Sequence, residues 1–284
     1  MLAALLSTAV LISLTPQQKA GLLVVSGLPP APNAGGVIVR QWDRDEPRSR
    51  ALLVYTDQEG GTVKTYPPVA PWKAASEIGS RREAYAAGVE TARGLRNVGV
   101  HVDLAPVLDL RDGPLGSRQY RSPAFGVAFA RGLAAGGVAA CAKHFPGLGP
   151  LPISTDERLY VRGRLRRADL APYREAIAAG VPCVMVGHGI YRNLGRRRAA
   201  LEPAAYRLLR RLGFHGVAIT DSLGVLGSDM APLWAVEAVR AGADLVLFPK
   251  AEDAARAVRA LARLPAADLD VHVQRVLRFR ARFR

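Results

Sequence analysis

The chain has 284 residues, of which 49 % are hydrophobic and 22 % charged, values typical of an ordinary folded and soluble protein. They exclude a disordered chain and a multi-spanning membrane protein, and the length fits one large α/β domain over 1–284. The 39 Lys and Arg against 24 Asp and Glu give a net charge of +15, which would suit nucleic acid, anionic lipid or an anionic wall polymer.

The first segment, 1–14, is an apolar stretch that is too short to span a bilayer and has no Lys or Arg before it. It continues directly into a helix start, with Thr15 as the cap and Pro16 at the first helical position. We therefore predict a cytoplasmic protein without a membrane span. The alternative is a secreted protein in which 1–14 is part of an export signal.

Short β-branched apolar runs then alternate with longer segments of helical period, which predicts parallel strands joined by crossover helices. Eight such strands would close a (β/α)8 TIM-type barrel. A doubly wound sheet is the alternative, but no Gly-x-Gly-x-x-Gly follows the first strand. The predicted strands are 22–25, 36–39, 51–55, 100–105, 137–143, 181–186, 217–219 and 243–248.

Two strands, 36–39 and 51–55, are separated by only 40–50, which barely meets the usual minimum of about ten residues for a crossover with its helix. The second barrel helix is therefore expected to be short or missing. Cys141 and Cys183 lie inside apolar strand-like runs without the spacing of metal ligands, and we interpret both as buried thiols.

The arginine excess is concentrated in a few segments, which we interpret as solvated helix faces. On this interpretation we predict no nucleic-acid partner, since a nucleic-acid binder would show an affinity that falls steeply with salt. The segments are 162–167, 196–198, 207–211 and 275–284.

Several apolar runs end directly in polar or glycine-rich residues, at the strand ends where parallel α/β folds place their sites. Four blocks show this most clearly, and in this order and spacing they resemble glycoside hydrolase family 3, particularly its single-domain β-N-acetylhexosaminidase branch. The blocks are ALLVYTDQEGGTV at 51–63, VGVHVDLAPVLDL at 98–110, GVAACAKHFPGLG at 137–149 and GFHGVAITDSL at 213–223.

The resemblance implies that Asp221 is the catalytic nucleophile, a carboxylate that attacks the anomeric carbon so that hydrolysis proceeds with retention. Cationic groups such as Lys143 and Arg118 would hold this carboxylate ionised. The structural alternative is that Asp221 only caps the following helix.

The resemblance also implies that Asp57, Arg118, Lys143 and His144 hydrogen-bond the sugar, and that His188 lines the pocket. As an alternative or in addition, Lys143 and Asp57 form an ion pair that shapes the barrel mouth.

One loop departs from the family pattern. After Lys-His-Phe-Pro-Gly the hexosaminidase branch carries Asp-Ser-His, whose histidine is the general acid and base, whereas an ungapped count places Ser154 and Asp156 at those two positions. A retaining mechanism needs a group that protonates the leaving oxygen, and a carboxyl can supply the proton. Asp156 is therefore the expected acid and base, with Glu157 as the other candidate.

The sequence thus predicts a retaining exo-glycosidase that acts on terminal β-linked N-acetylhexosamine, for example in peptidoglycan fragments. The competing hypothesis is a catalytically weakened or inactive barrel that binds glycans or serves as a scaffold. The expected partner is a carbohydrate substrate and the expected state is a monomer. No metal or organic cofactor is implied, because no ligand-spaced His and Cys cluster occurs.

Overall fold

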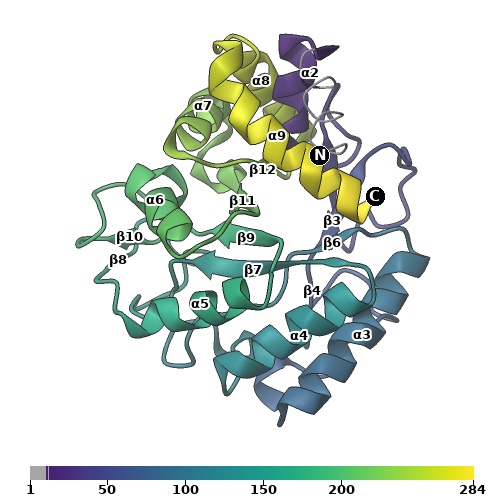
Figure 1. The fold of residues 1–284 in the computed structure, drawn as a ribbon, viewed down its shortest axis with the longest axis vertical. Helices are drawn as coiled ribbons and strands as arrows, with labels where there is room; N and C mark the ends of the chain where they lie inside the picture. Colours follow the sequence, from purple (N-terminus) through teal and green to yellow (C-terminus); the bar gives the residue numbers. More distant parts are fainter. Residues whose placement is uncertain (1–10, 12) are drawn as a thin grey trace.

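The computed structural model describes residue 11 and residues 13–284, so the predicted apolar segment 1–14 lies largely outside the described residues. Eight parallel strands form a barrel in which neighbours follow one another in chain order (Figure 1). The ring is completed where Ile219 pairs with Leu245. The strands are β1 (Val24–Ser26), β2 (Gly36–Val39), β3 (Leu53–Thr56), β6 (Val102–Asp103), β7 (Ala139–Phe145), β9 (Cys183–Val186), β11 (Val217–Thr220) and β12 (Val246–Phe248).

The predicted (β/α)8 barrel is therefore confirmed, and each of the eight predicted strands overlaps one barrel strand. Every residue of these strands is buried, as expected when side chains fill the barrel interior on one face and pack against helices on the other. Short additional pairs lie outside the barrel: β4 (Gln58–Gly60) with β5 (Val63–Lys64), and β8 (Arg162–Gly163) with β10 (Ile190–Tyr191).

Helices cover most of the barrel (Figure 1). The helix α2 precedes β1, and its predicted start is confirmed: Thr15 caps it in a capping box with Gln18, and Pro16 is its first residue. The helices are α2 (Pro16–Leu22), α3 (Arg81–Asn97), α4 (Pro123–Ala135), α5 (Ala171–Ala178), α6 (Pro203–Arg211), α7 (Ala231–Ala241), α8 (Ala251–Leu261) and α9 (Ala266–Phe283).

The connection between β2 and β3 contains no helix, which confirms the expectation for the second barrel helix. The connection between β1 and β2, at 27–35, also lacks a helix, and this was not expected. Nine residues of extended chain span roughly 30 Å, which is enough to return along a strand of three or four residues. Short strands therefore make both helices dispensable for the parallel pairing.

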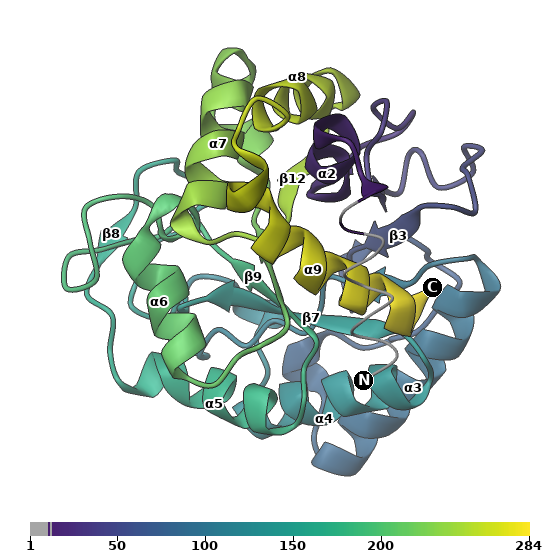
Figure 2. The same ribbon diagram turned by 45° about the horizontal axis from the view of Figure 1, so that its top comes forward.

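The last helix, α9, runs across the barrel in both views (Figures 1 and 2). Its Arg280 donates hydrogen bonds to the carbonyl oxygens of Gly35 and Ala51, which lie at the entrances to β2 and β3. Arg275 binds Asp244, just before β12. The helix therefore lies at the N-terminal ends of the strands, opposite the ends where the predicted site residues occur.

One sequence interpretation is wrong, and a second holds for only half of the segments that it covers. Cys141 and Cys183 are not thiols but form a disulfide between the neighbouring strands β7 and β9, because facing register positions bring their side chains together. The arginines of 162–167 and 196–198 lie on β8 and in loops rather than on helix faces, whereas 207–211 belongs to α6 and 275–283 to α9. Among the described residues, no helix is both long and apolar enough to cross a membrane.

Candidate active site

The mouth of the barrel gathers polar side chains from the ends of β3, β7, β9 and β11. Asp57 follows β3, Lys143 and His144 lie near the end of β7, and Asp221 follows β11. The Lys143 Nζ atom lies 2.5 Å from Asp57 Oδ1, across 86 positions of sequence. The predicted ion pair between these two residues is therefore present.

A second carboxylate, which sequence reasoning missed, lies at the centre of this charge cluster. Glu59 on β4 receives two hydrogen bonds from Arg118, both 2.8 Å long, and its Oε1 lies 2.7 Å from Lys143 Nζ. The side chains of Glu59 and Lys143 are each only 3 % exposed. Two cations thus share one buried carboxylate, and Asp57 completes the charge balance at the solvent side.

Electrostatics keep this cluster ionised. Burial alone would raise the pKa of Glu59, but Lys143 and Arg118 outweigh it and lower the pKa to about 2. Burial lowers the pKa of Lys143, whereas Asp57 and Glu59 raise it above its ordinary value. Lys143 is therefore an ammonium group at neutral pH, held at a fixed place with its donors directed at carboxylates.

His144 is oriented by a buried carboxylate. The Nδ1 atom of His144 lies 2.7 Å from Asp109 Oδ2. The Asp109 carboxylate also accepts hydrogen bonds from the backbone amides of His144 and Leu148. A carboxylate that receives the Nδ1 hydrogen fixes the ring orientation and leaves Nε2 as the second functional atom. Asp109 lies in the block 98–110 directly after an apolar run, so the rule that polar residues follow strands places it at the mouth, although the sequence alone could not pair it with His144.

Asp221 lies half-buried at the end of β11. Its backbone amide donates to the carbonyl of Val186 on β9, and its Oδ1 accepts the amide of Ser222. The short helical turn that follows begins at Leu223, and its N-cap, Ser222, makes no side-chain cap hydrogen bond. Asp221 therefore does not cap a helix, and that alternative is wrong.

The charge state of Asp221 follows from its neighbours. Burial raises the pKa of its carboxyl, but His188, His144, the Ser222 amide and Lys143 outweigh burial, so that the pKa lies below the ordinary value of 3.8. Asp221 is thus a carboxylate at neutral pH. The barrel places Lys143 and His144 near the end of β7 and His188 after β9, and β9 is the direct neighbour of β11, which leads to Asp221.

His188 follows β9 and is buried. Its Nε2 lies 2.9 Å from the carbonyl oxygen of Ser222, to which it donates as a ring N–H, while its buried Nδ1 has no partner. Burial lowers the pKa of His188, only partly counteracted by Asp221. At neutral pH the ring is therefore uncharged, and it connects the loop after β9 to the loop after Asp221.

Asp156 lies apart from this buried group. Its side chain is 67 % exposed, and its Oδ2 lies 3.4 Å from Arg118 Nη1. Glu157 is also exposed. Carboxylic acids that donate protons at neutral pH typically lie in apolar pockets, and this loop offers Asp156 a cation and solvent instead. Within the described part of the chain, no group of three or more His, Cys, Asp or Glu side chains could hold a metal ion.

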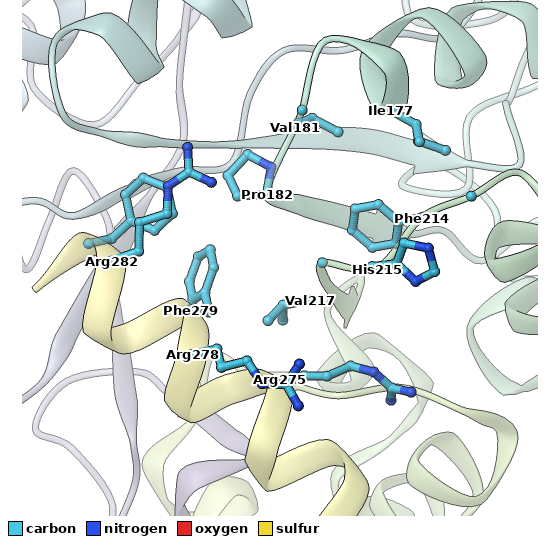
Figure 3. Close-up of a pocket in the computed structure, with 14 residues that line it drawn as sticks. Ile177, Val181, Pro182, Phe214, His215, Val217, Arg275, Arg278, Phe279 and Arg282 are labelled. Carbon is cyan, nitrogen blue, oxygen red and sulfur yellow. The ribbon is translucent and has the colours of Figure 1, made fainter. Parts of the chain in front are cut away.

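A separate cavity of about 370 Å³ lies at the other end of the barrel (Figure 3). It is lined by Arg275 and Phe279 of α9 and by Pro182 and Phe214, which precede β9 and β11. It contains none of the predicted site residues. In barrels of this type the N-terminal face serves stability and the C-terminal face carries the chemistry, so we place the candidate active site at the mouth around Asp221.

The protein is a closed α/β barrel. Carboxylates, histidines and a buried lysine lie at its C-terminal face, which is where enzymes of this fold have their active sites. The chain belongs to glycoside hydrolase family 3: the model of the glycosyl hydrolase family 3 N-terminal domain matches residues 34–279. This confirms the resemblance drawn from the four sequence blocks.

Known relatives and solved structures agree with this assignment. A protein named β-hexosaminidase from Bordetella parapertussis is 32 % identical over 265 residues, which cover 83 % of this chain and 74 % of the relative. A β-N-acetylglucosaminidase of the family from a Paenibacillus species superposes with a TM-score of 0.85 at 30 % identity, covering 95 % of this chain and 63 % of that one. For LpqI of M tuberculosis the TM-score is 0.82 at 26 % identity, with 96 % of each chain covered.

Proposed function

We propose that this protein is a retaining exo-glycosidase that removes terminal β-linked N-acetylhexosamine from glycans such as peptidoglycan fragments, with Asp221 as its nucleophile. The observation that carries the proposal is the ionised Asp221 carboxylate at the end of β11, among His144, His188 and Lys143. The names of the relatives, β-hexosaminidase and β-N-acetylglucosaminidase, support the substrate class.

In the proposed reaction, an Asp221 oxygen attacks the anomeric carbon while the bond from that carbon to the leaving oxygen breaks. The leaving oxygen takes a proton from an acid, for which Asp156 is the residue at the matching loop position. Water then attacks the glycosyl-enzyme and gives one proton back to that group, so that Asp221 and the acid are regenerated. Asp57, Arg118, Lys143 and His144 would hold the sugar hydroxyls with fixed charged donors and acceptors.

The nucleophile is tested with an aryl β-N-acetylglucosaminide whose leaving group is acidic and needs little protonation. Turnover by the wild type should fall by about a thousandfold or more in Asp221→Ala, while N-acetylglucosamine binding measured by calorimetry persists. Equal turnover in both proteins would contradict the role of Asp221.

The proton donor is tested by changing the leaving group. In Asp156→Asn, cleavage of a disaccharide should fall by about a hundredfold to ten-thousandfold, with a much smaller loss for the acidic aryl substrate. Glu175→Gln, which changes an exposed acid on α5, is the matched control. If both substrates are affected equally, Asp156 is not the acid.

A second candidate function is favoured by the loop itself, because Asp156 is exposed and paired with Arg118. In this case the barrel binds a glycan without cleaving it, or cleaves it slowly. Absence of turnover of the aryl substrate together with intact sugar binding would support this function.

The cellular location is also a proposal. A buried disulfide such as that between Cys141 and Cys183 typically forms in oxidising compartments, which favours the export alternative over the predicted cytoplasm. Fractionation of cells that express the native gene would decide between the two.

A further inference from the structure

Another cavity, of about 390 Å³, is lined by residues of β8, of β10 and of the loop that follows β10. This small sheet lies at the edge of the molecule next to α6 (Figure 1). Three of its five lining residues are arginines, Arg162, Arg192 and Arg196, and no acidic side chain lines it. It is therefore a cationic concavity rather than a flat charged surface.

The backbone around this cavity is fixed by hydrogen bonds. The amide of Arg192 donates to Gly163 O over 3.1 Å, which continues the β8–β10 pairing. The side chain of Asn193 accepts the amide of Leu165 and donates to its carbonyl, both over 2.9 Å. The two loops that carry the arginines are thus joined at several points.

The three guanidinium groups have no ion pair within the described part of the chain, whereas the two arginines that follow Arg196 each have a partner. Arg197 pairs with Glu237, and Arg198 lies over the ring of Tyr160. The nearby carboxylate of Glu202 accepts backbone amides instead. Like charges around one concavity repel one another, and an anion placed among them removes this cost.

The cavity lies on the same side of the barrel as Asp221. Its lining residue Ile190 is two positions after His188, and the amide of Ala200 donates to Gly187 O, which keeps this loop against the end of β9. Strand β9 pairs along its whole length with β11, which leads to Asp221. The loop that carries Arg192 and Arg196 is therefore anchored to the end of β9, the strand that neighbours the one leading to Asp221.

We propose that Arg162, Arg192 and Arg196 form a subsite for an anionic group, a carboxylate or a phosphate, on the part of the glycan beyond the sugar that Asp221 attacks. Guanidinium forks bind both groups in bidentate geometry. The substrate class is therefore an acidic glycan rather than a neutral one. This inference rests on the proposed function and adds the charge of the substrate to it.

The test compares three disaccharides with terminal N-acetylglucosamine: one neutral, one with a carboxylate on the second sugar, and one with a phosphate there. In the triple variant Arg162→Gln, Arg192→Gln, Arg196→Gln, kcat/KM for the better acidic substrate should fall by at least about tenfold, and for the neutral one by less than about twofold. Whichever acidic substrate responds identifies the anion.

The matched control is the triple variant Arg164→Gln, Arg167→Gln, Arg174→Gln, which removes the same charge from exposed arginines outside the cavity. It should leave the ratio of acidic to neutral kcat/KM unchanged. An equal loss in both triple variants would show only long-range attraction and would overturn the subsite.

Binding measurements separate this inference from the proposed function. Calorimetry of the same disaccharides with Asp221→Asn needs no turnover, so the cavity variant should lose acidic-glycan affinity even if the wild type is no enzyme. Unchanged affinity overturns the subsite while leaving the glycosidase proposal intact. A short single-stranded DNA that binds more tightly than either acidic disaccharide, and only with the arginines present, would also overturn it.

Discussion

Glu59 is the residue around which the charges of the mouth are arranged. It lies two positions after Asp57, and in an extended segment side chains at i and i+2 point to the same side. That spacing was a usable signal, yet the sequence alone could not show that Lys143 and Arg118 would converge on it. Their convergence depends on the barrel bringing β3, β6 and β7 together.

We expect Glu59→Gln to lower the free energy of unfolding by about 3 kcal/mol, because two cations lose their shared buried partner while Lys143 keeps Asp57. Urea unfolding at neutral pH measures the change. Glu157→Gln, an exposed acid, should stay within about 0.5 kcal/mol of the wild type.

The same residue sets an acid limit on stability. The pKa of Glu59 lies near 2 in the folded chain, below its ordinary 4.5, so its contribution is complete above pH 4.5 and is lost as pH falls toward 2. In urea unfolding at stepped pH, the difference between the wild type and Glu59→Gln should therefore shrink over that window. A difference that stays constant down to pH 2 would contradict this account.

The lowered pKa of Asp221 leads to a prediction for the pH dependence of activity below pH 7. Since the pKa of Asp221 is held below 3.8, the proposed nucleophile stays ionised in mild acid, and kcat/KM for the acidic aryl substrate should not fall between pH 7 and about 4.5. Assays after preincubation at each pH and return to neutral separate titration from unfolding. An acid limb centred above about pH 5.5 would mean that another group must lose its proton.

At the scale of elements, the sequence predicted the eight strands because buried parallel strands are continuous apolar runs bounded by polar residues. It also indicated the missing helix between β2 and β3 from a short spacing. The missing helix between β1 and β2 was not predicted, because the residues between 22–25 and 36–39 are enough in number for a short crossover helix. The position of α9 could not be predicted, since it depends on contacts far apart in sequence, such as Arg280 with Gly35.

These contacts suggest how the two helix-free connections are held. Arg280 donates to carbonyls at the ends of 27–35 and 40–52, so Arg280→Ala should leave both oxygens without their partner. We expect faster amide hydrogen exchange in these two connections, with little change in β9 and β11. The control is Arg278→Ala on the same helix, because the Arg278 side chain donates a long hydrogen bond, of 3.5 Å, to Gln274 of α9 itself.

At the scale of the whole molecule, the disulfide joins β7 and β9, the strands that end in the lysine–histidine pair and His188. The sequence pattern correctly placed both cysteines in buried strands, but it could not reveal that the strands are neighbours in matching register. Adjacency of strands is a property of the closed barrel, as are the charge clusters of the mouth.

We expect the oxidised protein to be more stable than the reduced one by roughly 4 kcal/mol, since the bond closes a loop between residues 42 positions apart. Urea unfolding with and without excess dithiothreitol measures the difference. Thiol titration of the unfolded, non-reduced protein should find neither cysteine reactive. Two reactive thiols would restore the original interpretation.

The closure of the ring is unequal on the two sides of β11. Four residue pairs join β11 to β9, whereas one pair, Ile219 with Leu245, joins β11 to the segment that leads into β12, together with backbone hydrogen bonds of Ala218 and Thr220 to residues 244 and 245. Local opening of the barrel should begin between β11 and β12, because fewer residues are paired on this side of β11 than on the β9 side. Asp221 follows β11 and His188 follows β9, and these two strands would stay paired during such an opening. The two side chains would therefore move together and keep their spacing.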